Sequence, residues 1–290
     1  MTKQEKEPEL EARYDVIIIG AGIGGLTCGA ALAKAGKKVL VCEQHIQPGG
    51  YVTSFKRKGF IFDGGLQSFG SNGLVFPILK ELGLYDKVQF VRADYQIITP
   101  DIKVKLNSLP QVREEFKRAF PQIESEVEAY FQDLEALLRP FEKMFAKDKP
   151  ALPLLSGLGR VVAMLSFPFT NFGFIKNMKR YQKTTSLDLI DQHLTENRIR
   201  FILSSLGYPI MSTMCTVGGW HSWLRDYWYP IGGMQNFANL FADLTKQNGG
   251  TISLRTKVDQ IIIENGMAGG VKLDDGRELC SKFVVSNIDW

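Results

Sequence analysis

The chain has 290 residues, of which 44% are hydrophobic, 23% charged and 11% aromatic. This composition excludes a disordered chain and supplies enough apolar side chains for one large domain or two of ordinary size. The formal charge of +4 is too small to indicate nucleic-acid binding without a concentrated basic patch, so we expect no nucleic-acid partner. The four cysteines and three histidines show no metal-ligand spacing, and we expect a reduced protein without a metal site.

The N-terminal region divides into a charged tail and a compact unit. Seven charges and no apolar core in residues 1–13 predict a disordered tail and exclude a signal peptide, which makes the cytoplasm the default compartment. The β-branched run 15–19, the Ala- and Leu-rich run 27–35 and the apolar run 39–42 predict a strand, a helix and a second strand. The fold therefore begins with a βαβ unit.

A glycine-rich turn joins the first predicted strand to the helix. Residues 20–25, Gly-Ala-Gly-Ile-Gly-Gly, match the GxGxxG pattern, in which glycines permit a tight turn, close approach to a pyrophosphate and close helix–strand packing. Glu43, at the end of the second strand, is placed to accept hydrogen bonds from ribose hydroxyls. The alternative is a turn that fits the pattern without a ligand, but strand, helix and acidic residue together favour a dinucleotide site. Both NAD and FAD use this arrangement.

The sequence pattern changes after residue 43. Residues 44–75 are dense in glycine and aromatic residues and predict loops and short strands, whereas the pattern from 76 to about 197 is largely helical. Strand patterns, among them one at 283–286, return after a helix expected at 234–247, and turns are expected at 264–266 and 274–276. The expected division is a first nucleotide-binding segment at 14–75, a substrate or cap domain at 76–230 and a second nucleotide-binding segment at 231–290.

Residues 151–175 carry one charge, Arg160, and raise the question of a membrane span. Two prolines and several polar residues interrupt this segment, so we reject a span. Four basic residues follow at once, namely Lys176, Lys179, Arg180 and Lys183. An apolar stretch beside a basic cluster is typical of a surface that dips into one leaflet and meets anionic headgroups. The alternative is a buried helical cap under a solvated basic face.

Several motifs resemble those of one enzyme family. They are Tyr14-Asp-Val-Ile-Ile-Ile-Gly-Ala-Gly-Ile-Gly-Gly-Leu, Glu43, Pro48-Gly49-Gly50, Gly59-Phe60-Ile61-Phe62-Asp63-Gly64-Gly65, Gly232-Gly233-Met234, Gly249-Gly250, Val258 and Val284-Val285-Ser286-Asn287. In this order the sequence resembles the FAD-dependent phytoene desaturase, carotenoid isomerase and retinol saturase family of the flavin amine oxidase superfamily. The resemblance covers most of the chain, weakly between about residues 76 and 183, and implies FAD rather than NAD.

The resemblance also implies which residues hold the cofactor. It assigns the glycine turn to the pyrophosphate, Glu43 to the adenosine ribose, the loop at 49–50 to a second pass close to the pyrophosphate and the 63–65 turn to the neighbourhood of the flavin ring. Val258 would offer its backbone to the adenine. The implied cofactor-binding set is Gly20, Gly22, Ile23, Gly24, Gly25, Glu43, Gln44, Gly49, Gly50, Tyr51, Gly64, Gly65 and Val258.

The chain departs from the family pattern at two places. Tyr51 stands where many relatives have an arginine, so the contact of that arginine is lost or supplied by Lys56 or Arg57. The family's C-terminal glycine-rich segment, which covers the ribityl and flavin end, does not follow before Trp290. We therefore expect the N-terminal part of a longer protein.

Flavin chemistry asks the protein for position, dryness and polarity, and requires no particular side chain. His221 is the one catalytic candidate, as an acid or base, and the alternative is a core histidine with satisfied hydrogen bonds. It lies in an aromatic stretch with Trp220, Trp223, Tyr227 and Trp228. These side chains either face a long hydrophobic substrate or pack a core.

The sequence thus predicts an α/β protein with a doubly wound, Rossmann-like FAD-binding domain and an inserted, largely helical substrate domain. The predicted function is FAD-dependent oxidoreduction of a long apolar, isoprenoid-like substrate, as desaturation, saturation or isomerisation, by hydride transfer at flavin N5. Two alternatives stay open: an amine-oxidase-like flavoenzyme on a small polar substrate, and a non-catalytic nucleotide-binding module. The expected partners are a hydrophobic small molecule and, on the interfacial interpretation, a membrane surface.

Overall fold

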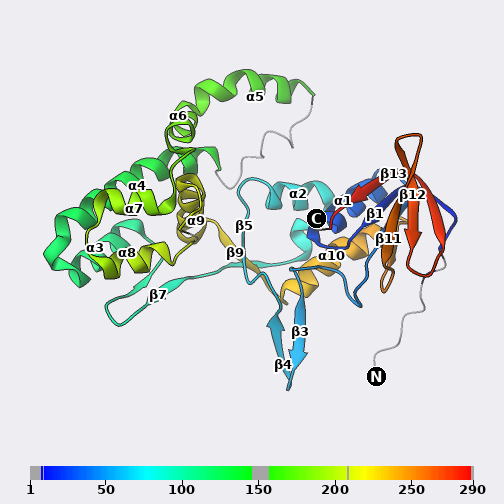
Figure 1. The fold of residues 1–290 in the computed structure, drawn as a ribbon, viewed down its shortest axis with the longest axis horizontal. Helices are drawn as coiled ribbons and strands as arrows, with labels where there is room; N and C mark the ends of the chain where they lie inside the picture. The colour runs from blue at the N-terminus through cyan, green and yellow to red at the C-terminus, as the bar shows by residue number, and fades with distance from the viewer. Residues whose placement is uncertain (1–7, 9, 146–156, 208, 289–290) are drawn as a thin grey trace. The chain divides into compact units, whose positions relative to one another are not determined.

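The computed structural model describes residues 8, 10–145, 157–207 and 209–288. The chain divides into two compact units, and neither is a continuous stretch of sequence (Figure 1). Unit 1 comprises residues 1–67, 80–90 and 229–290, and unit 2 comprises residues 68–79 and 91–228.

Unit 1 is built on a six-stranded sheet with the order β10-β2-β1-β13-β12-β11. Its strands are β1 (Arg13–Ile19), β2 (Val39–Cys42), β10 (Thr251–Ser253), β11 (Val258–Glu264), β12 (Met267–Leu273) and β13 (Glu278–Ser286). The pairs β10–β2, β2–β1 and β1–β13 are parallel, with Ile17 opposite both Leu40 and Val284, whereas β12 and β11 pair antiparallel. The carboxyl ends of the parallel strands therefore lie at one edge of the sheet.

The two faces of this sheet are covered differently. Helices α1 (Ile23–Lys34) and α10 (Met234–Gln247) pack on one face, where Gly29 of α1 lies against Ile18, Val41 and Thr245. Alternate strand residues form a separate apolar cluster that includes Ile17, Ile19, Leu40, Cys42, Val271, Leu273 and Leu279. A short 3-10 helix, η1 (Tyr85–Lys87), also belongs to unit 1. The predicted α/β class, with a largely parallel sheet, is confirmed.

The residues just before β1 make fixed contacts. The backbone oxygen of Ala12 accepts a hydrogen bond from Cys280 N at 3.0 Å, and Leu10 packs against the apolar cluster of the sheet. Residues 10–13 therefore differ from the disordered tail that their composition predicts, because the neighbouring strand β13 supplies partners for them. The remainder of that predicted tail, residues 1–7 and 9, lies outside the described residues.

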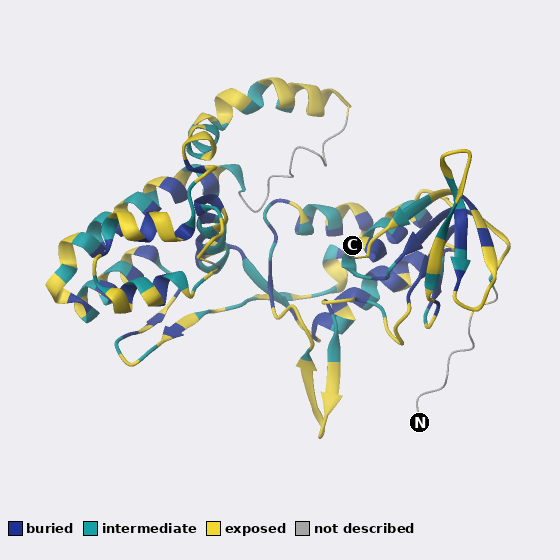
Figure 2. Ribbon diagram, viewed as in Figure 1, coloured by how far each residue is buried: buried dark blue, intermediate teal, exposed yellow. Residues whose placement is uncertain are grey.

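A two-stranded hairpin, β3 (Ser54–Arg57) and β4 (Phe60–Asp63), extends from unit 1. At its base, Asp63 Oδ1 accepts hydrogen bonds from Ser54 Oγ at 2.7 Å and from Met234 N at 3.1 Å. These bonds fix the hairpin to the first turn of α10. Beyond the base its side chains are exposed (Figure 2).

The rest of the chain is mainly helical. Its helices are α2 (Val75–Leu82), α3 (Leu109–Ala119), η2 (Pro121–Ile123), α4 (Glu124–Met144), α5 (Gly157–Thr170), α6 (Phe172–Tyr181), α7 (Ser186–His193), α8 (Asn197–Ser204) and α9 (Thr213–Arg225). Its short strands are β5 (Phe69–Gly70), β6 (Phe90–Arg92), β7 (Gln96–Ile98), β8 (Lys103–Lys105) and β9 (Tyr227–Pro230).

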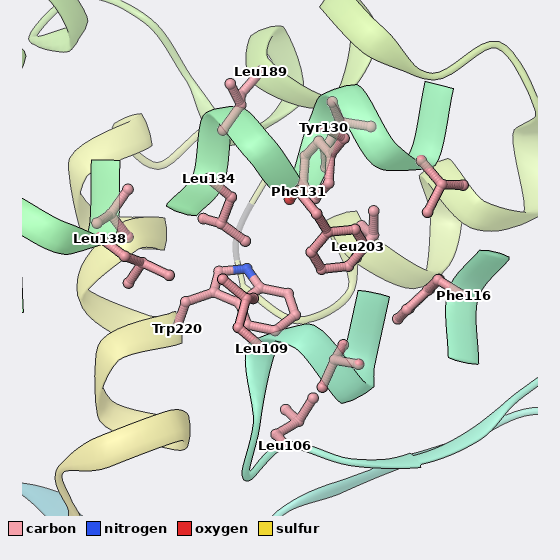
Figure 3. Packing of buried hydrophobic residues seen from close by; sticks show 14 of the residues in the cluster. Leu106, Leu109, Phe116, Tyr130, Phe131, Leu134, Leu138, Leu189, Leu203 and Trp220 are labelled. Atoms are coloured by element: carbon pink, nitrogen blue, oxygen red, sulfur yellow. The ribbon is translucent and has the colours of Figure 1, made fainter. Parts of the chain in front are cut away.

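Unit 2 has its own hydrophobic core, which helices α3, α4, α7, α8 and α9 share (Figure 3). Phe131 of α4 lies at its centre, with ring centroids 5.6 Å from Phe116 and 6.0 Å from Trp220. All three rings are almost fully buried. Edge-to-face and tilted pairs of this kind contribute about 0.5–1.5 kcal/mol beyond the burial of their area.

The expectation of a largely helical region from residue 76 was wrong between residues 90 and 105. Three short strands occupy this stretch, and β7 pairs with β8 in an antiparallel hairpin. Ile97 and Val104 are the buried residues at the centres of these strands, and their neighbours are exposed. This alternation of buried and exposed residues, with a period of two, is typical of a strand, and the prediction of a helical region did not take it into account.

The apolar segment 151–175 is helical from residue 157 onward, and Pro168 lies inside α5. The buried-cap interpretation was wrong for this helix, since none of its residues is buried. In the described part of the chain no single helix is long and apolar enough to cross a membrane. Helices α5 and α6 pass that test of length and composition only together, and they are bent by 64°. Residues 151–156 lie outside the described residues.

Candidate cofactor site

A cavity of about 700 Å³ opens in unit 1 at the carboxyl edge of the parallel strands. This edge is where open α/β sheets bind ligands, and the volume lies within the range of ~300–1,000 Å³ that small-molecule pockets span. The predicted residues that line it are Gly20, Gly22, Ile23, Gly24, Glu43, Gln44, Gly49, Gly50, Tyr51 and Val258. Three predicted residues are not in its lining, namely Gly25, Gly64 and Gly65.

The glycine turn leads from β1 directly into the N-terminus of α1. The first intrahelical hydrogen bond runs from Leu26 N to Gly22 O at 2.9 Å. The amides of Ile23, Gly24 and Gly25 precede this bond, and the first turn carries no acidic residue. Amides at a helix N-terminus and the positive end of the helix dipole favour an anionic group. The turn therefore offers a phosphate site on the wall of the cavity.

Gly25 acts through packing rather than through the cavity. A Cβ atom built on Gly25 would collide with the backbone oxygen of Gly20 and would lie 3.2 Å from Asn287 Nδ2. The obstacle is backbone, which cannot rotate away. A glycine at position 25 is therefore needed for α1 to start this close to β1.

Glu43 is buried at the end of β2 and connects two loops. Its Oε2 accepts a hydrogen bond from Ala21 N at 2.7 Å, and its Oε1 accepts one from His45 N at 2.9 Å. A carboxylate has about four acceptor positions, so these two bonds leave capacity for a hydroxyl donor in the cavity. Glu43 thus holds the glycine turn and can still receive a ribose.

The loop after β2 passes directly against the glycine turn. Gly49 N donates to Ala21 O at 2.8 Å, and a Cβ on Gly50 would lie 3.2 Å from Gly22 Cα. Gly49 has a φ of 126°, which favours glycine there. The sequence therefore identified two adjacent walls of the same cavity.

Gly64 and Gly65 lie beside this loop. Gly64 N donates to Thr53 O at 2.7 Å, and a Cβ on Gly65 would lie 2.7 Å from the backbone oxygen of Tyr51. Their glycine character follows from this close passage. Their predicted place near a flavin ring stays a prediction.

Eight lining residues lie outside the predicted cofactor-binding set, namely Ile19, Cys42, His45, Val52, Thr256, Lys257, Asn287 and Ile288. Asn287 N donates to Ile19 O at 2.9 Å, which places the end of β13 beside the glycine turn. Its position directly after a predicted strand could have identified it. Lys257 adds an exposed cation to the lining, and no sequence signal marks it. Burial raises the pKa of the Cys42 thiol to about 12, so this cysteine is protonated at neutral pH and is not a nucleophile.

His221 lies in unit 2, on α9, and is 4% exposed. Its ring centroid is 5.4 Å from that of Phe141, and among the described residues neither ring nitrogen has a hydrogen-bond partner. Burial lowers the pKa of His221, Asp226 and Glu142 oppose this shift, and Arg225 and Arg92 reinforce it. The histidine is therefore neutral at pH 7. His221 is therefore a core residue, but within the residues that the structure describes it lacks the hydrogen bonds that the alternative of a core histidine assumed.

The aromatic residues around His221 make ring contacts within unit 2. Trp220 is fully buried and meets Trp223 at 5.9 Å between centroids, Tyr227 meets Tyr95 at 5.0 Å, and Trp228 meets Phe76 at 5.3 Å. Trp220 therefore belongs to the packed core, whereas Trp223, Tyr227 and Trp228 are half-buried.

The strand, glycine turn, helix N-terminus and buried acidic residue define a dinucleotide-binding α/β protein. Comparison with known families gives the particular one. The chain belongs to the flavin-containing amine oxidoreductase family, whose model matches residues 23–289, and the cofactor of this family of oxidoreductases is FAD.

Three curated relatives show similar degrees of likeness. The chain is 27% identical to a Danio rerio protein named inactive all-trans-retinol 13,14-reductase, covering 99% of this chain and 49% of that protein. It is 29% identical to a Daucus carota chloroplastic prolycopene isomerase, covering 94% and 46%. It is 27% identical to a Methylomonas 4,4'-diapophytoene desaturase (4,4'-diapolycopene-forming), covering 95% and 53%. The chain thus spans about half the length of these relatives.

Solved structures agree on the fold. An oxidoreductase from Methanosarcina mazei superposes with a TM-score of 0.58 at 21% identity, covering 94% of this chain and 58% of that one. At this identity the likeness concerns the fold alone.

Proposed function

We propose that this protein works as an FAD-dependent oxidoreductase on a long apolar isoprenoid-like compound of the carotenoid or retinoid class. The observation that carries the proposal is the cavity at the carboxyl edge of the sheet, with its glycine turn and Glu43, in a chain of the flavin-containing family. The substrate class is supported by the names of the relatives, which refer to retinol, prolycopene and diapophytoene.

The residues of the cavity fit the ADP half of FAD. The amides at the start of α1 would bind the pyrophosphate, and Lys257 would add positive charge to the cavity. Glu43 would accept hydrogen bonds from the adenosine ribose through the acceptor positions that its two backbone bonds leave free. Val258, at the start of β11, would present its backbone to the adenine.

The proposed reaction balances as a two-electron oxidation or reduction. Bound FAD would accept or give the hydride at N5. In desaturation the substrate loses a hydride and a proton, and oxygen, a quinone or another acceptor finally receives the two electrons. Saturation needs a reductant instead, and isomerisation has no net redox change. His221 stays a proposed acid or base, because a neutral imidazole can accept a proton.

The test begins with flavin retention by the purified chain. Under anaerobic conditions, carotenoid precursors, retinoids and their saturated analogues are added singly, and the flavin spectrum and the extracted products are followed. We expect at least one of these compounds to bleach the flavin or to be converted. In a parallel assay with oxygen, turnover of small polyamines with formation of peroxide would instead support the amine-oxidase alternative. Flavin binding without any spectral change or product would support the non-catalytic alternative.

The predicted cytoplasmic location and the predicted contact with a membrane also stay proposals. An apolar substrate of this class dissolves in lipid, so a membrane surface is where the protein would meet it.

A further inference from the structure

Helices α5 and α6, called here the apolar arm, present an unusual surface for a protein in water. Leu158, Leu165 and Phe169 are 78%, 71% and 85% exposed. Other exposed apolar residues of the arm are Val161, Val162, Met164 and Phe172. A helix that is apolar on all sides is normally covered, and contiguous exposed patches of this kind mark interaction sites.

The arm is attached to the core of unit 2 through α6. The ring of Phe174 lies 5.8 Å from those of Phe141 and Phe145, and Gly173 allows close contact with Pro140 of α4. Helix α5 then leaves α6 at a bend of 64° (Figure 1). One end of the arm is therefore held firmly while its most apolar part is exposed (Figure 2).

The charge of the arm has one sign. Residues 157–187 contain five basic residues and no acidic residue. Four of these cations, Lys176, Lys179, Arg180 and Lys183, are exposed at or just beyond α6. Within the described part of the chain none of the four has an ion-pair partner. Unpaired cations beside an apolar helix complement anionic headgroups that lie beside acyl chains.

The dimensions favour a contact in the plane of the membrane. A helix of 14 residues, the length of α5, is about 21 Å long, which is less than the hydrocarbon thickness of ~30 Å. Its bend against α6 keeps the two helices from forming one straight span. The exposed cations of α6 stay near the phosphate level if α5 lies parallel to the surface.

We propose that the apolar arm docks the protein on an anionic lipid bilayer, with α5 at the boundary between headgroups and acyl chains and the cations of α6 on lipid phosphates. The docking goes beyond the proposed reaction, because it depends on neither flavin nor turnover. Vesicle binding and substrate conversion are separate readouts, so either proposal can fail alone.

The first experiment measures flotation of the full chain with phosphatidylcholine vesicles, with and without phosphatidylglycerol. We expect binding to the anionic vesicles at about 0.1 M salt and little at 1 M, because screening shortens the reach of the charges. Replacing Lys176, Lys179 and Arg180 together by glutamine should weaken binding about 100-fold, at roughly fivefold for each cation. Binding that is equal on neutral vesicles, or absent on both, would overturn the proposal.

Two variants test whether the exposed apolar residues of α5 are responsible for vesicle binding. L165S/F169S should abolish flotation, whereas F201S, at a residue 73% exposed on α8 in the same unit, should leave it unchanged. Circular dichroism checks that each variant folds. If L165S/F169S floats like the wild type, or if its loss is matched by F201S, the assignment of the surface is wrong.

A position-specific readout distinguishes lipid from a second copy of the chain. Leu165→Trp should be quenched by lipids brominated on the acyl chain, and Phe201→Trp should not. Light scattering without vesicles gives the oligomeric state. A dimer that L165S/F169S dissociates, together with no quenching of Leu165→Trp, would show that the arm covers another protein copy and would overturn docking on lipid.

Discussion

Gly25→Ala tests how the start of α1 is held against β1. The added Cβ would collide with the backbone oxygen of Gly20 and would come within 3.2 Å of Asn287 Nδ2. Relief would require α1 to move by roughly 1 Å, and overpacking of this kind costs about 1–3 kcal/mol. Alanine returns up to ~1 kcal/mol of helix propensity. We therefore expect the variant to lose up to ~2 kcal/mol of unfolding free energy.

A matched substitution in the same chain isolates the steric part. Gly159→Ala lies in α5, where a Cβ would meet no atom within 4 Å. We expect this control to gain about 0.5–1 kcal/mol, since only propensity and unfolded-state entropy act there. The propensity gain is common to both Gly→Ala substitutions and cancels, so the difference between them should equal the overpacking cost of about 1–3 kcal/mol.

Urea unfolding of both variants without cofactor measures this difference, and hydrogen exchange of the α1 amides assigns the loss to unit 1. A titration with FAD should show weaker binding to Gly25→Ala, because the shifted helix carries the amides of the phosphate site. Equal stability of the two variants would refute the packing role. Normal stability with weakened FAD binding would mean that Gly25 acts on the cofactor and not on the fold.

Three further predictions concern single residues. Glu43→Gln leaves one of two backbone amides without its acceptor and should cost about 1–3 kcal/mol of stability and weaken FAD binding, checked by urea unfolding and flavin titration. The pKa of His221 is lowered in the fold, so the unfolding free energy of the wild type should fall as the pH drops below about 6.5. His221→Phe should reduce the slope of unfolding free energy against pH by up to ~1.4 kcal/mol per pH unit. Identical slopes for the two proteins would contradict this prediction. Phe131→Ala should cost about 3–5 kcal/mol against less than ~0.5 for exposed Phe201→Ala, measured by urea unfolding; similar losses would refute the separate core of unit 2.

The sequence predicted the local parts of unit 1 well because neighbouring residues determine them. The helix expected at 234–247 has those bounds as α10, since glycines close both of its ends. The turn expected at 264–266 joins β11 to β12 with positive φ at Asn265 and Gly266. The residues of such a turn determine its conformation, so the turn can be predicted from the sequence alone.

The sequence predicted less where distant residues decide the outcome. The short strands at 90–105 form because they pair with other strands, and this pairing cannot be read from their own residues. A single buried residue in a strand, such as Ile97, is too short a pattern to predict the strand. The apolar composition of α5 was visible, but burial and exposure of an apolar helix look alike in sequence. Lys257 lines the cavity because the loop before β11 passes the end of β2, where Thr256 N donates to Glu43 O at 2.8 Å.

Close packing of the glycine turn against the end of β13 also favours glycines, without any cofactor. A Cβ on Gly20 would lie 2.8 Å from the backbone oxygen of Asn287, and one on Gly24 would lie 2.7 Å from Asn287 Oδ1. The backbone at the end of β13, more than 260 residues away in the sequence, thus disfavours a side chain at Gly20 even without a nucleotide, whereas the obstacle at Gly24 is a side chain that can rotate. Glycines at these positions therefore support a close-packed turn and a phosphate site equally well. The inference of a cofactor depends instead on the amides at the start of α1, the remaining acceptor positions of Glu43 and the cavity that these groups line.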